Sequence, residues 1–293
     1  MNGTAARIHA LSRWWPLGIA TRWLPLGIAL AAALVVYAPA IAAMAAEWME
    51  FPSLSHGFAI PLLSAYLLWR RRELIAAEPM ESSVGGLVLL VLALGALALG
   101  TLGGEPFIVR LSFPLTLFGL VLFLAGPGVT RRAWIGLAYL VFMIPLPYLT
   151  LKALTYQSQL FDAWMTATAL GWLGVPVLRN GIMLVLPNIT LEVAADCSSV
   201  PAIAALVALG AAYSQMQPRP GWLRAALTLA AAPLGLLSNI VRLILTSLAA
   251  YYIGPVALEN VIHKFSGTSV FLLTVALLVV LDSALLRLSR RTG

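Results

Sequence analysis

The chain has 293 residues, of which 61% are hydrophobic and 10% are charged, and its mean hydropathy is +0.95. A soluble domain carries about 25% charged residues, so this chain has too few to cover a water-facing surface. The composition excludes a soluble enzyme, a disordered chain and a nucleic-acid-binding domain, and it predicts an all-α polytopic membrane protein. The net charge of +7 fits such a protein, because Lys and Arg collect in cytoplasmic loops.

Membrane-spanning helices are the first elements that the sequence predicts, since a span needs about 20 mostly apolar residues. Eight segments qualify, at about 23–46, 54–69, 84–103, 107–126, 133–150, 198–214, 223–251 and 266–286. The second is short and contains Pro61, so it is the weakest as an independent span. The inner loops are too short for a soluble domain. We therefore treat residues 1–293 as a single membrane-embedded domain.

The basic residues predict the orientation of the bundle. With the N-terminus in the cytoplasm and eight spans, 13 of the 18 Lys and Arg residues lie on the inner side. These are Arg7, Arg13, Arg22, Arg70, Arg71, Arg72, Arg131, Arg132, Arg219, Arg224, Arg287, Arg290 and Arg291. The outer side holds Arg110, Lys152, Arg179, Arg242 and Lys264. This bias predicts a protein of the cytoplasmic (inner) membrane with both termini inside.

One outer segment, residues 151–197, is less hydrophobic than the spans, and the site search therefore concentrates there. Its first part, 151–173, is predicted to form an interfacial helix. The expected apolar face contains Leu154, Leu160, Phe161, Trp164 and Leu170, with Gln157, Ser158 and Asp162 facing elsewhere. The second part, Ile182–Val193, alternates in character and is interrupted by Pro187-Asn188, a turn signal. It predicts two short strands or an extended loop that leads to Cys197.

Arg242 is the clearest ionisable residue inside an apolar span, where burial of a charge is costly and indicates function by default. The alternative is an arginine that snorkels to the outer headgroups. Asn239 lies three residues earlier, on the same helix face. A polar neighbour of this kind favours a polar pocket over snorkelling.

Cys197 is the single cysteine, which excludes an intrachain disulfide and a paired redox motif. It is predicted to lie at a loop-to-helix junction, where a helix N-terminus lowers the pKa of a thiol. Asp196 acts the other way unless it caps the helix. The alternative is that Cys197 is a small buried hydrophobe.

His263 follows the next outer turn and precedes the last span. The predicted topology puts Cys197, Arg242 and His263 on the outer side of the membrane together. A cysteine and a histidine suit acyl transfer by a thiolate–imidazolium pair, and an arginine can stabilise the oxyanion that develops.

Several motifs along nearly the whole chain resemble those of the exosortase/archaeosortase family of integral-membrane cysteine transpeptidases. In order, they are Ser55-His56-Gly57-Phe58, Trp69-Arg70-Arg71-Arg72, Pro145-Leu146-Pro147, Val193 to Ser198, Asn239-x-x-Arg242 and His263-x-x-Ser266-Gly267. One position departs from the family pattern of Cys-Ser-Gly, because Ser199 stands where glycine is expected. The departure leaves the nucleophile intact and suggests a divergent subfamily with a non-standard substrate signal.

The resemblance implies a membrane cysteine protease or transpeptidase. Cys197 would be the nucleophile, His263 would move protons to the leaving amine, and Arg242 would hold the oxyanion or orient the thiolate. Supporting or substrate-binding residues would be Asn239, His56, Ser198 and Glu192. For His56, an interfacial histidine at a helix start is the alternative.

The resemblance also implies the partners of such an enzyme. Its substrates would be membrane-anchored exported proteins with a C-terminal sorting signal of the PEP-CTERM type. They would be cleaved at the outer face of the membrane and passed to an envelope polysaccharide or lipid acceptor. No cofactor or metal is expected, because the sequence has no His-x-x-x-His pair or carboxylate cluster. No nucleic-acid partner is expected either.

A different functional class stays open, namely a polytopic transporter or lipid-carrier flippase without peptidase activity. It would need inverted repeats and ionisable residues near mid-membrane on several helices. Apart from Arg242 and Arg110, the predicted spans lack them. Asp282, near the inner end of the last span, is expected to pair with Arg287. A scaffold without chemistry is the third alternative.

Overall fold

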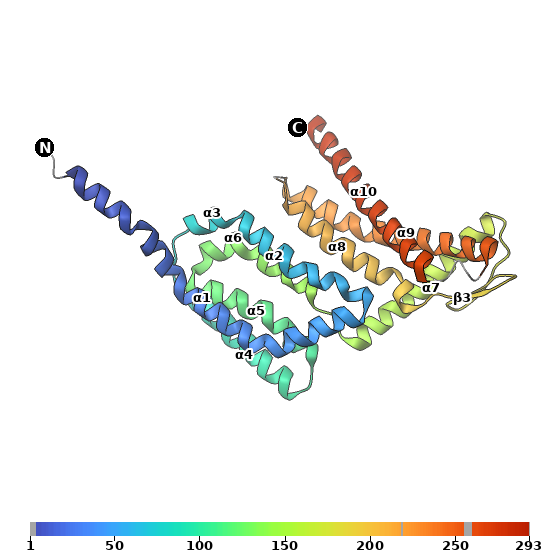
Figure 1. Cartoon of the computed structure of the whole chain (residues 1–293), viewed down its shortest axis with the longest axis horizontal. Coiled ribbons are helices and arrows are strands. Elements are labelled where there is room, and N and C mark those ends of the chain that lie inside the picture. The colour runs from blue at the N-terminus through green and yellow to red at the C-terminus, as the bar shows by residue number, and fades with distance from the viewer. Residues whose placement is uncertain (1–3, 218, 255–259, 293) are drawn as a thin grey trace. The chain divides into compact units, whose positions relative to one another are not determined.

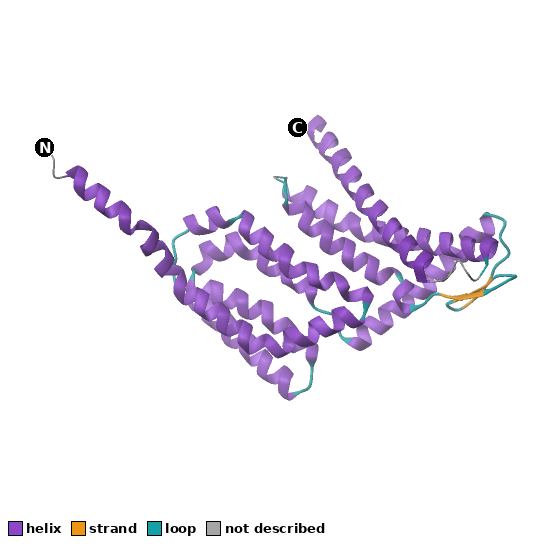
Figure 2. Ribbon diagram, in the orientation of Figure 1, coloured by secondary structure: helices purple, strands orange, loops and turns teal. Residues whose placement is uncertain are grey.

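The computed structural model describes residues 4–217, 219–254 and 260–292, with side chains for 22–217, 219–254 and 269–287. Helices make up 82% of the residues, and one small sheet accompanies them in the described part (Figure 2). The predicted all-α class is confirmed. The chain divides into two compact units, which are described separately: unit 1 is Met1–Glu47 with Gly57–Pro145, and unit 2 is Trp48–His56 with Leu146–Gly293.

Unit 1 contains most of the first helix and the helices that follow it as far as Pro145 (Figure 1). The elements are α1 (Thr4–Glu50), α2 (Ala59–Arg70), α3 (Arg72–Ala77), α4 (Val84–Leu102), α5 (Pro106–Leu124), α6 (Gly126–Tyr139) and η2 (Leu140–Met143). The last residues of α1 and most of the 3-10 turn η1 (Pro52–Phe58) belong to unit 2. A Cβ on Gly86 would lie 2.2 Å from the main-chain nitrogen of Phe123, and one on Gly119 would lie 2.9 Å from that of Leu90. Small residues of this kind let membrane helices approach closely, so glycine sets the spacing of α4 and α5.

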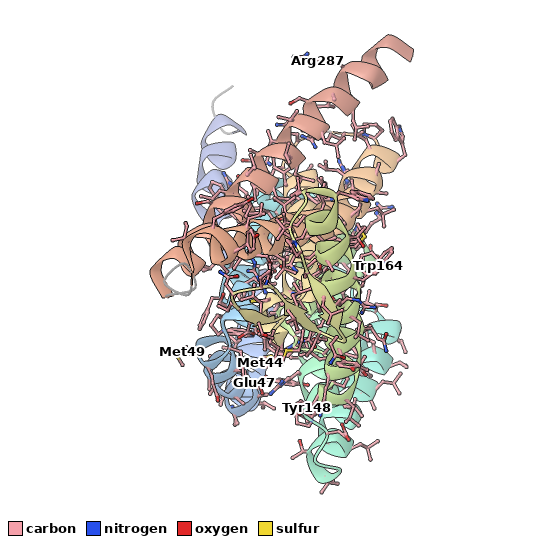
Figure 3. The ribbon with its side chains drawn as sticks, turned by 90° about the vertical axis from the view of Figure 1, so that its right-hand side faces the viewer. Met44, Glu47, Met49, Tyr148, Trp164 and Arg287 are labelled. Carbon is pink, nitrogen blue, oxygen red and sulfur yellow. The ribbon has the colours of Figure 1, made fainter. Side chains whose placement is uncertain are left out.

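Polar side chains within unit 1 satisfy one another. Arg110 donates to the carboxylate of Glu47, with Nη1 2.9 Å from Oε2; Glu47 is labelled on α1 in Figure 3. The hydroxyl of Tyr37 lies 2.8 Å from that of Ser112 and 2.9 Å from that of Thr116. A buried charge is tolerated when it is paired, so Arg110 acts as a structural partner within this unit.

Unit 2 contains the remaining helices and the sheet. Its further elements are α7 (Tyr148–Trp172), β1 (Leu178–Asn180), β2 (Met183–Val185), β3 (Thr190–Glu192), the 3-10 turn η3 (Ala195–Cys197), α8 (Ser199–Gln215), α9 (Gly221–Ile253) and α10 (Asn260–Thr292). Both strand pairs are antiparallel, in the order β1-β2-β3. The β2–β3 turn contains Pro187-Asn188, which confirms the two predicted strands. β1 was not predicted, and it joins β2 through Gly181 at a φ of 62°, a conformation that glycine adopts without strain.

The predicted span at 133–150 is wrong as a continuous helix. The helical segment Gly126–Met143 ends before the Pro145-Leu146-Pro147 motif, and α7 begins after it, at Tyr148. Proline has no N–H to donate and disfavours helical backbone at the residue before it. The two prolines therefore separate what the hydropathy pattern presented as one element.

α7 buries a mixed face, on which polar residues lie beside Leu170, the one completely buried member of the predicted apolar face. Asp162 and Thr166 are completely buried, whereas Trp164 is 50% exposed and Phe161 is 41% exposed. Figure 3 labels Trp164 on this helix. In a membrane protein the apolar side chains can face lipid, and the polar side chains turn inward to find partners. The apolar face of such a helix therefore does not identify its buried face.

Five of the described helical segments are long and apolar enough to cross a membrane: Arg22–Glu50, Val84–Leu102, Pro106–Leu124, Gly221–Ile253 and Ser269–Arg287. The helical segments Gly126–Met143 and Tyr148–Trp172, on either side of the prolines, would make a sixth if they were counted as one span. The predicted spans at 54–69 and 198–214 correspond to α2 and α8, with 12 and 17 residues. The count of eight spans is therefore not confirmed, although a multi-pass membrane protein is.

Asp282 pairs with Arg219, which corrects the expected partner, Arg287. Nη1 and Nη2 of Arg219 lie 2.5 and 2.6 Å from the two carboxylate oxygens, and the Tyr213 hydroxyl donates to Oδ2 over 3.1 Å. The side chains are 0% and 3% exposed. Arg287 lies farther along α10, toward its C-terminal end (Figure 3). The buried pair joins the segment before α9 to the last helix, a contact between residues distant in sequence.

Candidate active site at the cysteine turn

A close contact between α8 and α9 determines which residues meet in the site. A Cβ on Gly235 would lie 2.9 Å from Cα of Ile203 and 3.1 Å from the carbonyl oxygen of Ala202, so only glycine fits there. The two helices run antiparallel and side by side (Figure 1). One helical turn from this contact, α9 carries Asn239 and α8 begins at Ser199. The glycine thus brings Asn239 to the start of α8.

Cys197 ends η3 directly before the cap of α8, at a loop-to-helix junction as predicted. Two side chains of α9 donate hydrogen bonds to the main chain of this cysteine turn (residues 195–199). Asn239 Nδ2 donates to the carbonyl oxygen of Cys197 over 2.8 Å. Arg242 Nη2 donates to that of Asp196 over 3.4 Å. The arginine motif therefore lies against the cysteine turn, although more than 40 residues of chain separate them.

Asp162 of α7 is completely buried at the same place. Its Oδ2 accepts hydrogen bonds from the Ser199 main-chain nitrogen at 2.8 Å, from Asn239 Nδ2 at 3.2 Å and from Ser158 Oγ at 3.2 Å. Its Oδ1 accepts from Ser199 Oγ at 2.5 Å. Sequence reasoning did not include Asp162 in the site, because it placed this residue away from the apolar face of an interfacial helix. The available signal was a carboxylate in a helix next to a membrane span, which is costly unless partnered.

The carboxylate of Asp162 caps α8 from a neighbouring helix. The N-cap residue Ser198 makes no capping hydrogen bond through its own side chain, and Asp196, the cap considered from the sequence, is exposed. A side-chain oxygen normally accepts from the first N–H groups of a helix, and a negative charge is favourable there. In this chain Asp162 supplies both the oxygen and the charge.

Burial raises the pKa of the Cys197 thiol above its ordinary value. The positive charge of Arg242 opposes this shift, and the negative charge of Asp196 adds to it. The pKa is therefore not lowered as the helix N-terminus alone would lower it, because removal from water disfavours the thiolate. In addition, the Ser199 N–H of that helix end is already bonded to Asp162.

Two buried donors face this turn without a hydrogen-bond partner among the described residues. They are Nε of Arg242 and the hydroxyl of Ser198. Ser198 is only 1% exposed. Buried polar groups are normally bonded, so these two donors are available to a group that enters the site.

The remaining predicted residues are not joined to this turn by the described contacts. His263 belongs to α10, but its side chain lies outside the described part of the structure. His56 lies in η1, where burial lowers its pKa and a hydrogen bond with the backbone of Ser53 raises it. Glu192 is exposed on β3. Neither His56 nor Glu192 makes a described hydrogen bond with the turn, and the described residues contain no group of three His, Cys, Asp or Glu suited to a metal ion.

Comparison with known proteins assigns the chain to a family. The model of the family described as transmembrane exosortase (Exosortase_EpsH) matches residues 48–280, a range that contains the cysteine turn, all of α9 and the first part of α10. No curated protein and no solved structure matches the chain. The family match covers most of the sequence, and the apolar helices agree with a multi-pass membrane protein. The chain therefore belongs to the transmembrane exosortase family.

Proposed function

We propose that this membrane protein is a cysteine transpeptidase that cleaves C-terminal sorting signals of exported proteins, of the PEP-CTERM type, and transfers the products to an envelope acceptor. The observation that carries the proposal is the pair of hydrogen bonds from α9 to the cysteine turn. They bring a cationic side chain to the only thiol of the chain. That combination suits acyl transfer through a covalent intermediate.

The nucleophile is Cys197, and it needs a base. Because burial raises the pKa of its thiol, the resting side chain carries its proton at neutral pH. We assign the base to His263, on the resemblance of its motif to the family pattern. Histidine suits this task because its pKa lies close to neutral pH.

The reaction then proceeds in two steps. Sγ of Cys197 attacks the carbonyl carbon of the scissile peptide bond while His263 takes the thiol proton, and an oxyanion forms on the carbonyl oxygen. The C–N bond breaks, the proton passes from His263 to the leaving amine, and a thioester remains. An amine or hydroxyl of the acceptor attacks the thioester, gives its proton to His263 and releases the Cys197 thiolate, which recovers that proton.

The oxyanion needs hydrogen-bond donors that are already in position. We assign them to Arg242 and Ser198, because Arg242 Nε and the Ser198 hydroxyl are buried and have no partner among the described residues. The main-chain N–H of Ser199 is not available, since it donates to Asp162 and Ser158. Asn239 supports the site by holding the Cys197 carbonyl oxygen.

We propose that the site faces the outer side of the inner membrane, with both termini inside. The distribution of the 18 Lys and Arg residues supports this orientation. The sorting motif of a membrane-anchored substrate would emerge at that face. We assign His56 and Glu192 to contacts with the substrate rather than to bond breaking. The acceptor would be an envelope polysaccharide or lipid.

A transporter is less well supported, because four ionisable side chains outside the cysteine turn are tied up in two ion pairs. Arg110 pairs with Glu47 and Arg219 pairs with Asp282. Transport pathways use ionisable residues that exchange partners with substrate or ions.

The test is processing of a co-expressed substrate, with the new C-terminus of the product identified by mass spectrometry. Cys197→Ala, Arg242→Ala and His263→Ala should each abolish processing while their abundance in the membrane fraction stays normal. Thr166→Val is the matched control, since the Thr166 hydroxyl is buried without a partner on α7. It should process normally. Normal processing by Cys197→Ala would refute the proposal.

A further inference from the structure

Hydrogen bonds from three segments converge on one carboxylate beside the nucleophile. Asp162 accepts from Ser199 at the start of α8, from Asn239 of α9 and from Ser158 of its own helix. We propose that Asp162 is a positioning residue that holds Cys197 at the geometry for attack on the substrate. The inference rests on the proposed function and adds a residue that neither the family motifs nor the sequence singled out.

The carboxylate is fixed in place by its partners. A completely buried carboxylate is unfavourable unless its oxygens are hydrogen-bonded, and here both oxygens of Asp162 are bonded. It also lies at the positive end of α8, where a negative charge is stabilised. Movement of the carboxylate would break several charge-assisted hydrogen bonds at once. Asp162 is thus a rigid point to which the turn is attached.

The attachment reaches the main chain at Cys197 and directly after it. After it, the Ser199 main-chain nitrogen and hydroxyl both donate to Asp162. At Cys197 itself, the same Asn239 Nδ2 that donates to Asp162 also donates to the Cys197 carbonyl oxygen. The two peptide groups that follow the nucleophile are therefore held by one carboxylate, directly and through one amide.

Serine at position 199 gives this attachment an additional bond. The family pattern has glycine there, and glycine has no side chain to donate to Asp162. The structure shows no positive φ at a non-glycine residue that it describes, so Ser199 is accommodated without strain. Its hydroxyl lies 2.5 Å from Asp162 Oδ1. Ser199 therefore reinforces the position of the turn.

Removal of the Asp162 carboxylate should affect kcat, because it changes where the nucleophile lies. Asp162 bonds to the turn through Ser199 and through Asn239, so its influence acts through the location of the turn. Misplacement of a reacting group by about 1 Å can cost about 100-fold in rate. Loss of the anchor should thus lower kcat and leave KM unchanged, because the sorting signal still binds.

The first experiment measures kcat and KM of the full-length protein in proteoliposomes with a sorting-signal substrate. Asp162→Ala should lower kcat by about 100-fold, and Asp162→Asn should recover part of the loss, because its amide oxygen still accepts from Ser199. The control Thr166→Val, one turn further along α7, should match the wild type. Wild-type kcat in folded Asp162→Ala would overturn the proposal, as would a loss confined to KM.

A double-mutant cycle separates positioning from general damage to the fold. Ser199→Ala alone should lower kcat modestly. In the Asp162→Ala background the same change should have no further effect, since its partner is already gone. Additive losses would overturn the proposal. Melting temperatures of all variants are measured alongside, so that a fall in kcat counts only for protein that remains folded.

A third measurement does not depend on activity. Cys197 is the only cysteine, so a maleimide reports on this thiol alone. Asp162→Ala should be alkylated several-fold faster than Thr166→Val at the same pH, because release of the turn exposes the half-buried thiol. Equal rates would overturn the anchoring role. Faster alkylation, together with normal processing by Cys197→Ala, would keep the anchor and refute the transpeptidase instead.

Discussion

Gly235→Ala tests whether the close contact of α8 and α9 determines the geometry of the site. The added Cβ would lie 2.9 Å from Cα of Ile203, whereas carbon atoms are in favourable contact at about 3.5–4.0 Å. The helices must therefore separate by about 0.5–1 Å to restore ordinary contact. Asn239 lies one turn from this contact, and its hydrogen bond to the Cys197 carbonyl would lengthen.

Two opposing effects determine the change in stability. Replacement of glycine by alanine within a helix stabilises it by about 1 kcal/mol, and overpacking costs about 1–3 kcal/mol. The net change should be a destabilisation of up to about 2 kcal/mol. The effect on processing should be larger, since a displacement of about 1 Å at the nucleophile can cost about 100-fold in rate.

The assay combines thermal unfolding in detergent with processing of a sorting-signal substrate at one temperature. Gly221→Ala is the matched control, because it lies on the same helix and a Cβ there meets nothing within 4 Å. It should melt no lower than the wild type and process normally. If Gly235→Ala behaved like Gly221→Ala in both measurements, the close contact would not determine the site, and the reasoning would be refuted.

Two further predictions concern charges. Arg219→Met should lower the free energy of unfolding by about 3–5 kcal/mol, because it leaves Asp282 buried and unpaired. The double variant Arg219→Met with Asp282→Leu should recover most of that loss. Thermal unfolding in detergent checks both, and equal melting temperatures of the single and double variants would contradict the pairing. Alkylation of Cys197 should accelerate as the pH rises, because only the thiolate reacts and burial raises the pKa of the thiol. Arg242→Gln removes the charge that lowers this pKa, so alkylation at a fixed pH near neutral should slow down. Asp196→Asn removes the charge that raises it, so alkylation should speed up. If the rate–pH curves of the wild type and the two variants coincided, the assigned effects of these charges would be refuted.

The sequence by itself determined the features that depend on composition and on local chain chemistry. The scarcity of charge identified a helical membrane protein, and the ordered motifs identified the family that the family model then matched. Pro187-Asn188 predicted the turn between β2 and β3, and the polar segment before α8 predicted a junction at Cys197. These features depend on composition or on residues that are close together in the chain, so they can be predicted from the sequence.

The tertiary structure decided which distant residues meet. Asp162 is a partner of the cysteine turn because the buried face of α7 carries it, and Asp282 pairs with Arg219 rather than Arg287. In a soluble protein the apolar face of a helix marks the core. In a membrane that face is equally stable against lipid, so the hydrophobic pattern cannot tell which side of α7 faces the protein. The contact of α8 with α9 at Gly235, together with the bonds from Asp162 of α7, brings the buried carboxylate, Asn239 and the cysteine turn together.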